Sequence, residues 1–201
     1  TIIYIYKFKM IVAIIPARSK SKRLKNKNVL PIKGMPMFVF VANILKKSKY
    51  ISKIYISTES KKYINICKKF NLNFIKRPKS LSGDKIEKQE VIVHATKKIL
   101  RSGLNVKTVI SIQPNSPELK LSDLHKALKF FSFKLYPKSN VKELICINSK
   151  NIQNPSFRIL TTKAVFQKTL STKIGVYKAD YVDIHTKKDY LLVKKKIEKI
   201  K

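Results

Sequence analysis

Residues 10–34 read MIVAIIPARSKSKRLKNKNVLPIKG, and this stretch decides the fold. The run from Ile11 to Ile15 is continuously apolar and stops at Pro16, which is typical of a strand buried on both faces of a parallel sheet. The polar segment that follows, residues 18–28, is called the basic loop below. Its cationic side chains are Arg18, Lys20, Lys22, Arg23, Lys25 and Lys27. Arginine binds phosphate oxygens as a fork and lysine as a point charge, so this loop is a candidate triphosphate site.

The charge of the basic loop does not by itself assign a function. The loop lacks the glycine-rich spacing and the closing Lys-Ser/Thr of a P-loop. The whole chain has a formal net charge of +34, and only five of its 45 basic residues are arginine. Because lysine is spread over the entire length, a merely solvated loop is an equally open interpretation at this point. A dedicated nucleic-acid-binding module would instead concentrate arginine and aromatic side chains on one element, so we expect no specific nucleic-acid partner.

Strand-like and helical segments alternate after the basic loop. We expect strands at 54–57, 71–75, 106–112, 144–147 and 177–184, and helices at 37–47, 61–70, 88–101, 123–131 and 187–199. This alternation predicts an α/β fold, a Rossmann-like three-layer sandwich with a mostly parallel central sheet. Such sheets bind ligands at the carboxyl ends of their strands, so the loops after Ile15, Ile56 and Ile112 are expected to form the site.

Length and composition predict one domain. The 201 residues with 44% hydrophobic content suit a single core, and we expect a nucleotidyltransferase domain over 10–201 after a non-native or disordered lead, 1–9. No apolar run reaches the roughly 18 residues that span a membrane. Cys67 and Cys146 are far apart and have no metal-binding spacing. We therefore expect reduced thiols, a cytoplasmic protein and no membrane partner.

The order of several motifs resembles that of the acylneuraminate cytidylyltransferases, enzymes with a nucleotide-diphospho-sugar transferase fold. The basic loop and its preceding strand keep the register of that family's opening motif. The matching segments are 14–18, 21–23, 27–28, 31–37, 56–59, 77–84, 113–117 and 182–189. No single motif is decisive for this family, but the order and spacing of the motifs together are fairly specific to it. The resemblance covers most of residues 10–132 and about 174–192.

The resemblance implies roles for particular residues. Arg18, Lys27 and Asn28 would be catalytic, and Arg18, Lys22, Asn28 and Arg77 would bind the nucleotide. Gln113 would bind the sugar, and Asp183 would help to carry Mg²⁺. The implied partners are CTP, an acidic sugar and a second copy of the chain in a homodimer. The implied reaction is transfer of CMP from CTP to an acidic nonulosonic sugar, similar to sialic acid, with release of pyrophosphate.

The sequence departs from the family pattern at several places, including the following three. The family's Gly-Gly pair after the first arginine is Ser19-Lys20, so the loop must trace differently or use the Lys20 side chain. The family's Asp-Ile-Asp is Asp183-Ile184-His185, and a histidine nitrogen suits Mg²⁺ poorly. Residues 133–174 are short for the arm that the family uses for dimerisation and sugar binding.

These departures keep alternatives open beside the cytidylyltransferase. One is a related nucleotidyltransferase that uses another sugar or base. Another is a catalytically impaired family member that binds nucleotide without turnover. A nucleic-acid-binding module is suggested only by the net charge of +34.

Overall fold

The structure, a computed structural model, describes residues 10–135, 139–169 and 172–199. The expected lead at 1–9 lies outside the described residues. No helix in the described part of the chain is long and apolar enough to cross a bilayer.

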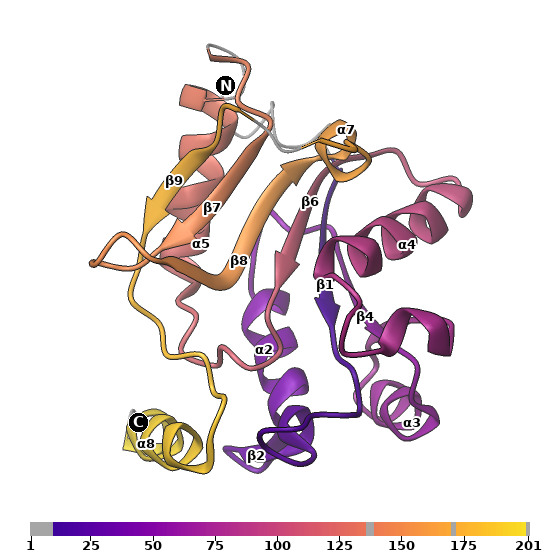
Figure 1. The fold of residues 1–201 in the computed structure, drawn as a ribbon, viewed down its shortest axis with the longest axis vertical. Helices are drawn as coiled ribbons and strands as arrows, with labels where there is room; N and C mark the ends of the chain where they lie inside the picture. Colours follow the sequence, from indigo (N-terminus) through magenta and orange to yellow (C-terminus); the bar gives the residue numbers. More distant parts are fainter. Residues whose placement is uncertain (1–9, 136–138, 170–171, 200–201) are drawn as a thin grey trace.

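A seven-stranded sheet forms the middle of the molecule (Figure 1). Its strands lie side by side in the order β5-β4-β1-β6-β8-β7-β9. Their bounds are β1 Met10–Pro16, β4 Lys53–Thr58, β5 Asn73–Lys76, β6 Val106–Ile112, β7 Glu143–Ile147, β8 Gln153–Thr161 and β9 Gly175–Lys178. Only β8 runs antiparallel to its neighbours, so the predicted mostly parallel sheet is confirmed.

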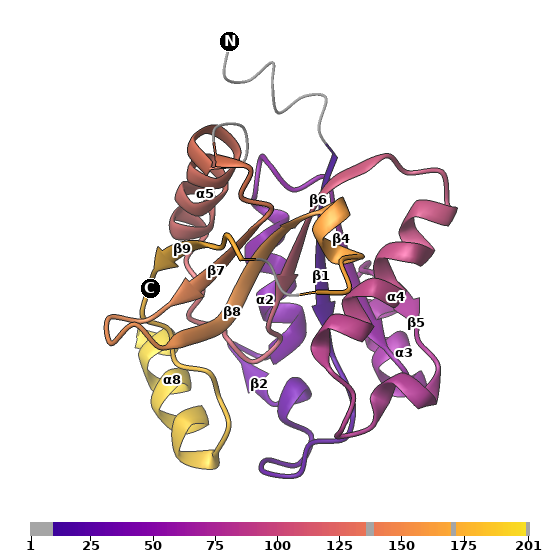
Figure 2. The same ribbon diagram turned by 45° about the horizontal axis from the view of Figure 1, so that its top comes forward.

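Helices cover both faces of the sheet, which confirms the three-layer sandwich (Figure 2). One face packs against α2 (Met37–Lys46), α3 (Lys61–Lys69) and α5 (Leu121–Lys129). The other face packs against α4 (Lys88–Arg101) and the short α7 (Thr162–Val165). The six-residue turn η3 (Phe130–Leu135) follows α5 directly.

β1 is buried on both faces because successive side chains of a strand point to opposite sides. Ile11, Ala13 and Ile15 join the core on the α2 face. Val12 and Ile14 join the core on the α4 face. All five side chains are at most 1% exposed, so the continuous apolar run has the central position that it predicts.

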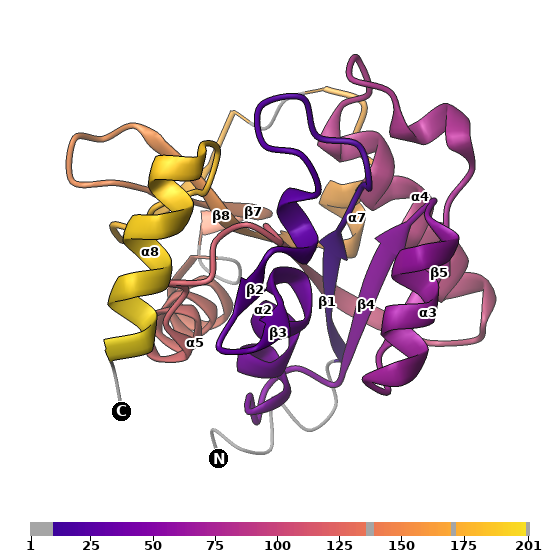
Figure 3. The same ribbon diagram turned by 90° about the horizontal axis from the view of Figure 1, so that it is seen from below.

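A smaller third core lies beside the carboxyl end of the sheet. It joins α8 (Lys187–Lys199) to the hairpin of β2 (Pro31–Ile32) and β3 (Met35–Pro36). Ile32, Met37 and Ile184 are its fully buried members. Through this core the chain's last helix packs against the segment that directly follows the basic loop (Figure 3).

The stretch 133–174 differs most from the sequence-based expectation. The strand expected at 144–147 is present as β7, but the nine-residue β8 after it was not predicted. β8 inserts between β6 and β7 and carries Phe157, Ile159 and Leu160 into the core. Residues expected to form an arm thus supply two strands of the central sheet, and their role in dimerisation stays a prediction.

The placement of β8 in the core gives a stability prediction. Phe157→Ala should lower the free energy of unfolding by about 3–5 kcal/mol, because Phe157 is 1% exposed and its loss leaves a cavity. The matched control is Ile152→Ala in the β7–β8 connection, which is 61% exposed and should change stability by less than about 0.5 kcal/mol. Urea unfolding followed by circular dichroism measures both. Equal stabilities for the two variants would show that β8 does not belong to the cooperative core.

Candidate nucleotide site

The loops after β1, β5 and β6 meet at the carboxyl edge of the sheet and enclose a cleft of about 490 Å³. Figure 3 views this edge directly, with the basic loop rising beside the end of β1. The cleft lies where ligands bind to open α/β sheets. Its walls contain Arg18, Lys22, Lys27, Asn28, Arg77 and Gln113, which are all the predicted site residues except Asp183. Asp183 lies two residues before His185, which does line the cleft.

The basic loop closes without the glycine pair of the resembled family. The Nδ2 of Asn28 donates to the Arg18 carbonyl at 2.9 Å, which joins the two ends of the loop. The left-handed residue that the turn needs is Asn26, with φ 56°, and asparagine tolerates this conformation better than most residues. Neither Ser19 nor Lys20 has a positive φ, so the loop does not need glycine at these two positions.

Glu59, at the end of β4, holds the basic loop against the rest of the site. One carboxylate oxygen accepts 2.7 Å hydrogen bonds from both the amide and the hydroxyl of Ser19. The other accepts from Nε and Nη2 of Arg77 at 3.3 and 3.0 Å. Burial favours the neutral carboxyl, but the hydrogen bonds from Ser19 and Arg77 outweigh it and hold the pKa of Glu59 below its ordinary value.

The Glu59 contacts define what Arg77 does in this structure. The Arg77 side chain is 3% exposed, and two of its nitrogens are occupied by Glu59. It therefore positions the basic loop through Glu59, in addition to lining the cleft. The sequence comparison aligned Glu59 with a family acid but did not reveal this role, because only the fold brings the two side chains together.

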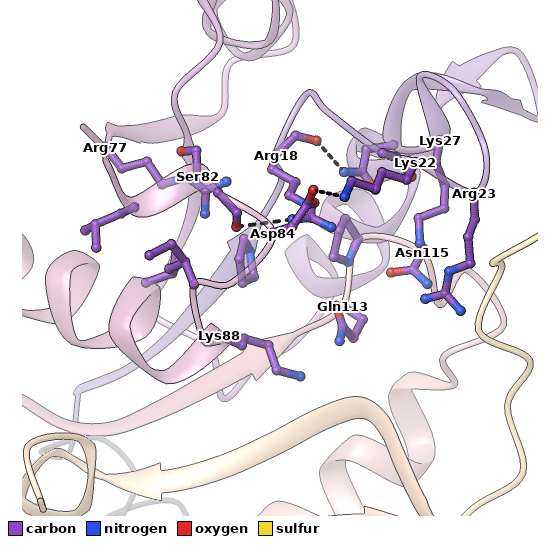
Figure 4. Close-up of a pocket in the computed structure, with 18 of the residues that line it drawn as sticks. Arg18, Lys22, Arg23, Lys27, Arg77, Ser82, Asp84, Lys88, Gln113 and Asn115 are labelled. Atoms are coloured by element: carbon purple, nitrogen blue, oxygen red, sulfur yellow. Dashed lines mark hydrogen bonds and ion pairs between the residues drawn. The ribbon is translucent and has the colours of Figure 1, made fainter. Parts of the chain in front are cut away.

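Asp84 bridges two cations of the basic loop across the mouth of the cleft (Figure 4). Its carboxylate lies 3.0 Å from Nη1 of Arg18 and 2.8 Å from Nζ of Lys22. The Lys22 hydrogen bond is the main cause of the lowered pKa of Asp84. Without substrate, then, an exposed carboxylate occupies the position where these cations would meet an anion.

The segment that carries Asp183 is held at the cleft by the loop after β6. The backbones of Asn115 and Ile184 hydrogen-bond at 2.9 Å, and Asn115 Nδ2 donates to the Ile184 carbonyl at 3.1 Å. The Ser116 hydroxyl donates to one oxygen of Asp183. The other oxygen, Oδ2, is buried without a hydrogen-bond partner in the described structure. A buried carboxylate oxygen without a partner is costly, and its charge makes a cation the partner that would fit it.

Opposite charges face one another across this end of the cleft. Burial raises the pKa of Asp183, although its hydrogen bond from Ser116 and nearby cations oppose the shift. Burial lowers the pKa of Lys27 to about 8, with Asp183 opposing and Arg23 adding to the shift. Lys27 therefore loses its proton more readily than an ordinary lysine, and a bound anion would raise this pKa again.

The residues after Asp183 were less clear from the sequence. Asp189 accepts from the amides of His185 and Thr186 at 2.9 and 2.8 Å, so it caps the start of α8. His185 lines the cleft, and its Nδ1 is buried without a partner in the described structure. Among the residues that the structure describes, no three His, Cys, Asp or Glu side chains are grouped to hold a metal ion. Asp183 fits Mg²⁺ only as one ligand among oxygens that the substrates supply.

The Glu59 arrangement predicts a large effect of removing one charge. Glu59→Gln should destabilise the fold by about 3 kcal/mol, because Arg77 would keep a buried and unpaired charge. Glu198→Gln is the control, since Glu198 is 43% exposed in an i,i+4 pair and should cost less than about 1 kcal/mol. Urea unfolding between pH 4 and pH 7 measures both.

The pH profile supplies a second readout. The lowered pKa of Glu59 means that its stabilisation is complete above its ordinary value of 4.5 and is lost as the pH falls further. The difference between wild type and Glu59→Gln should therefore shrink at the acid end. A constant difference, or none at any pH, would contradict the assigned role.

The sequence of this chain matches those of known proteins. The profile of the cytidylyltransferase family matches residues 12–169, which is more than half of the chain. The N-acylneuraminate cytidylyltransferase of Escherichia coli O18:K1:H7 is 32% identical over 121 residues, which are 60% of this chain and 28% of that relative. A Helicobacter pylori protein named pseudaminic acid cytidylyltransferase and UDP-2,4-diacetamido-2,4,6-trideoxy-beta-L-altropyranose hydrolase is 37% identical over 84 residues. These are 41% of this chain and 16% of that relative.

Solved structures agree on the fold. CMP:2-keto-3-deoxy-manno-octonic acid synthetase complexed with CTP superposes with a TM-score of 0.77 at 13% identity, over 94% of this chain and 99% of that one. The chain spans less than a third of the length of the two curated relatives above. The family profile nevertheless covers the basic loop, the Glu59 contacts and the loop after β6. The chain belongs to the cytidylyltransferase family.

Proposed function

We propose that this chain transfers CMP from CTP to an acidic nonulosonic sugar with release of pyrophosphate. The observation that carries the proposal is the charge arrangement of the cleft. Three cations of the basic loop, Arg18, Lys22 and Lys27, line the cleft. The unpaired oxygen of Asp183 belongs to the adjoining segment, which Asn115 holds at the edge of the cleft. Triphosphate and a divalent cation would complement these two charges.

The triphosphate would take the place that Asp84 holds in this structure. Asp84 forms exposed ion pairs with Arg18 and Lys22, and such pairs contribute little to stability. A triphosphate presents more negative charge to the same cations and can bind the Arg18 guanidinium as a fork. Asn28 keeps Arg18 in position by its bond to the Arg18 carbonyl. These contacts support the catalytic and nucleotide-binding roles of Arg18, Lys22, Lys27 and Asn28.

The reaction asks the protein mainly for positioning and charge neutralisation. The anomeric hydroxyl oxygen bonds to the α-phosphorus as its proton passes to solvent water, and the bond from that phosphorus to the oxygen between the α- and β-phosphates breaks. Pyrophosphate leaves with the electron pair, and Lys27 and Arg18 stabilise the developing charge. Asp183 would hold Mg²⁺ together with phosphate oxygens, and the ion would supply further neutralisation of the triphosphate.

The sugar is proposed only as a class. The two relatives described above carry the names of acylneuraminate and pseudaminic acid, which are both acidic sugars. Gln113 lines the cleft and supports a sugar-binding role. A homodimer remains a prediction. A cytoplasmic location also remains a prediction, and it would suit the buried free thiols of Cys67 and Cys146.

A second candidate function is nucleotide binding without turnover. His185 favours it, because a histidine stands where the resembled family has an aspartate and its Nδ1 is buried without a partner in the described structure. CTP binding without pyrophosphate release, followed by release from a His185→Asp variant, would support this candidate. Turnover by the unmodified chain excludes it.

The test of the proposed function is pyrophosphate release from CTP and Mg²⁺ with a panel of nonulosonic acids. Arg18→Ala should lower kcat/KM at least about 100-fold, because one preorganised charge at the reacting phosphates is lost. Its stability should change by less than about 1 kcal/mol, since the Arg18 side chain is 39% exposed. The control is Arg101→Ala, which removes an exposed arginine at the end of α4.

The outcomes of this assay are distinct. Full activity of Arg18→Ala would remove the basic loop from the reaction. A folded wild-type chain that turns over no acid of the panel would contradict the proposed function. Replacing CTP by UTP, GTP or ATP in the same assay identifies the base.

A further inference from the structure

We propose that Lys88 binds the carboxylate of the sugar and thereby selects acidic over neutral sugars. This inference rests on the proposed function and assigns a substrate contact to a residue outside the family motifs. Lys88 lies four residues after Asp84 and places a positive charge in the lining of the cleft.

The position of Lys88 separates it from the triphosphate cations. It is the first residue of α4 and lines the cleft together with Gln113. Figure 4 shows its side chain extending toward Gln113, away from the cluster of Arg18, Asp84 and Lys22. The phosphate-binding cations and Lys88 thus occupy different walls, as two substrates with separate negative charges require.

Lys88 also lacks a carboxylate partner of its own. The described part of the chain contains six ion pairs closer than 4 Å, and Lys88 takes part in none of them. Arg158, the neighbouring cation, is occupied by Glu143 at 2.6 Å and by Gln89 at 2.8 Å. Lys88 is therefore the cation available to an incoming anion at this wall.

The surroundings of Lys88 make an anion favourable there. Burial lowers the pKa of Lys88, with the negative charge of Asp183 opposing the shift and Arg158 adding to it. An ammonium group partly removed from water is costly unless it gains a charged or hydrogen-bonded partner. Asp183 also interacts with Lys27, so its single charge is shared between two lysines. A substrate carboxylate would supply the missing negative charge.

The chemistry of the pocket favours a carboxylate over a further phosphate. The triphosphate already has Arg18, Lys22 and Lys27 on the opposite wall. A single ammonium beside the Gln113 amide matches a small planar anion, with the charge on Lys88 and a hydrogen bond from Gln113. A neutral sugar in the same place would leave the Lys88 ammonium partly desolvated and without a counter-charge.

The experiment compares an acid with its ester. For the panel acid with the fastest turnover, kcat/KM is measured for the free acid and for its methyl ester, which removes the charge and adds one methyl group. Wild type should prefer the acid by about 10- to 100-fold, the usual effect of one charged hydrogen-bonded contact. Lys88→Met should reduce the ratio of kcat/KM for the acid to kcat/KM for the ester to about three or less. The KM for CTP should stay within about twofold of wild type.

Two further variants make the result specific. Lys88→Arg should keep most of the preference for the acid, because it retains the charge. Lys85→Met is the matched control, since Lys85 is an exposed lysine on the same segment and should behave as wild type. This acid-to-ester comparison is a double-mutant cycle that isolates the contact from general effects of the substitution.

The outcomes separate this inference from the proposed function. An active wild type with an unchanged acid-to-ester ratio in Lys88→Met overturns the role of Lys88 alone. A large rise in the KM for CTP with an unchanged ratio also overturns it, and assigns Lys88 to the phosphates. A wild type that is silent with every acid overturns the proposed function, and the Lys88 inference with it.

Discussion

The ion pair between Glu59 and Arg77, with its two hydrogen bonds from Ser19, is the interaction on which the site depends. It joins the loop after β1 to the ends of β4 and β5. A phosphate-binding loop without glycines needs such support, because its backbone cannot fold back as freely. Asn28 completes the arrangement by joining the two ends of the loop. These contacts hold the loop in place although its six cationic side chains repel one another.

In a chain with only 11 acidic residues against 45 basic ones, the places of the acids are informative. Glu59 positions the basic loop, Asp84 neutralises two of its cations, and Asp183 faces Lys27 and Lys88. Glu118 accepts from the Val182 amide and pairs with Lys196, which fixes the segment before Asp183. Four of the eleven acids thus position or neutralise segments that build the cleft, while most lysines are exposed.

Most of the fold was predictable because its signals are local. The apolar run of β1 and the alternation of helices and strands do not depend on distant residues. The cap of α3 is local too, because the hydroxyl of Ser60, directly before the helix, accepts from the Tyr63 amide at 3.4 Å. β8 escaped prediction because its sequence mixes polar residues with Phe157 and Ile159, and its partners β6 and β7 flank it only after folding.

The candidate site likewise has a part that the sequence predicts and a part that it does not. Arg18, Lys22, Lys27 and Asn28 lie in one continuous loop, so their proximity follows from the sequence. The contact of Arg77 with Glu59, and that of Arg18 with Asp84, bring together residues 18 and 66 positions apart. Asp183 reaches the cleft only through Asn115 and Ser116, 67 or more positions before it. Such long-range contacts depend on strand order and register, which a single sequence does not state.

The central claim is that the basic loop binds a triphosphate, and calorimetric titration of the wild-type chain with CTP and with CMP tests it most directly. CTP should bind at least about 100-fold more tightly than CMP at low salt. This difference in affinity should decrease as added salt screens the exposed cations Arg18 and Lys22. Equal affinities for CTP and CMP at low salt would mean that the β- and γ-phosphates make no contact with the loop, and the basic loop would then not be a triphosphate site.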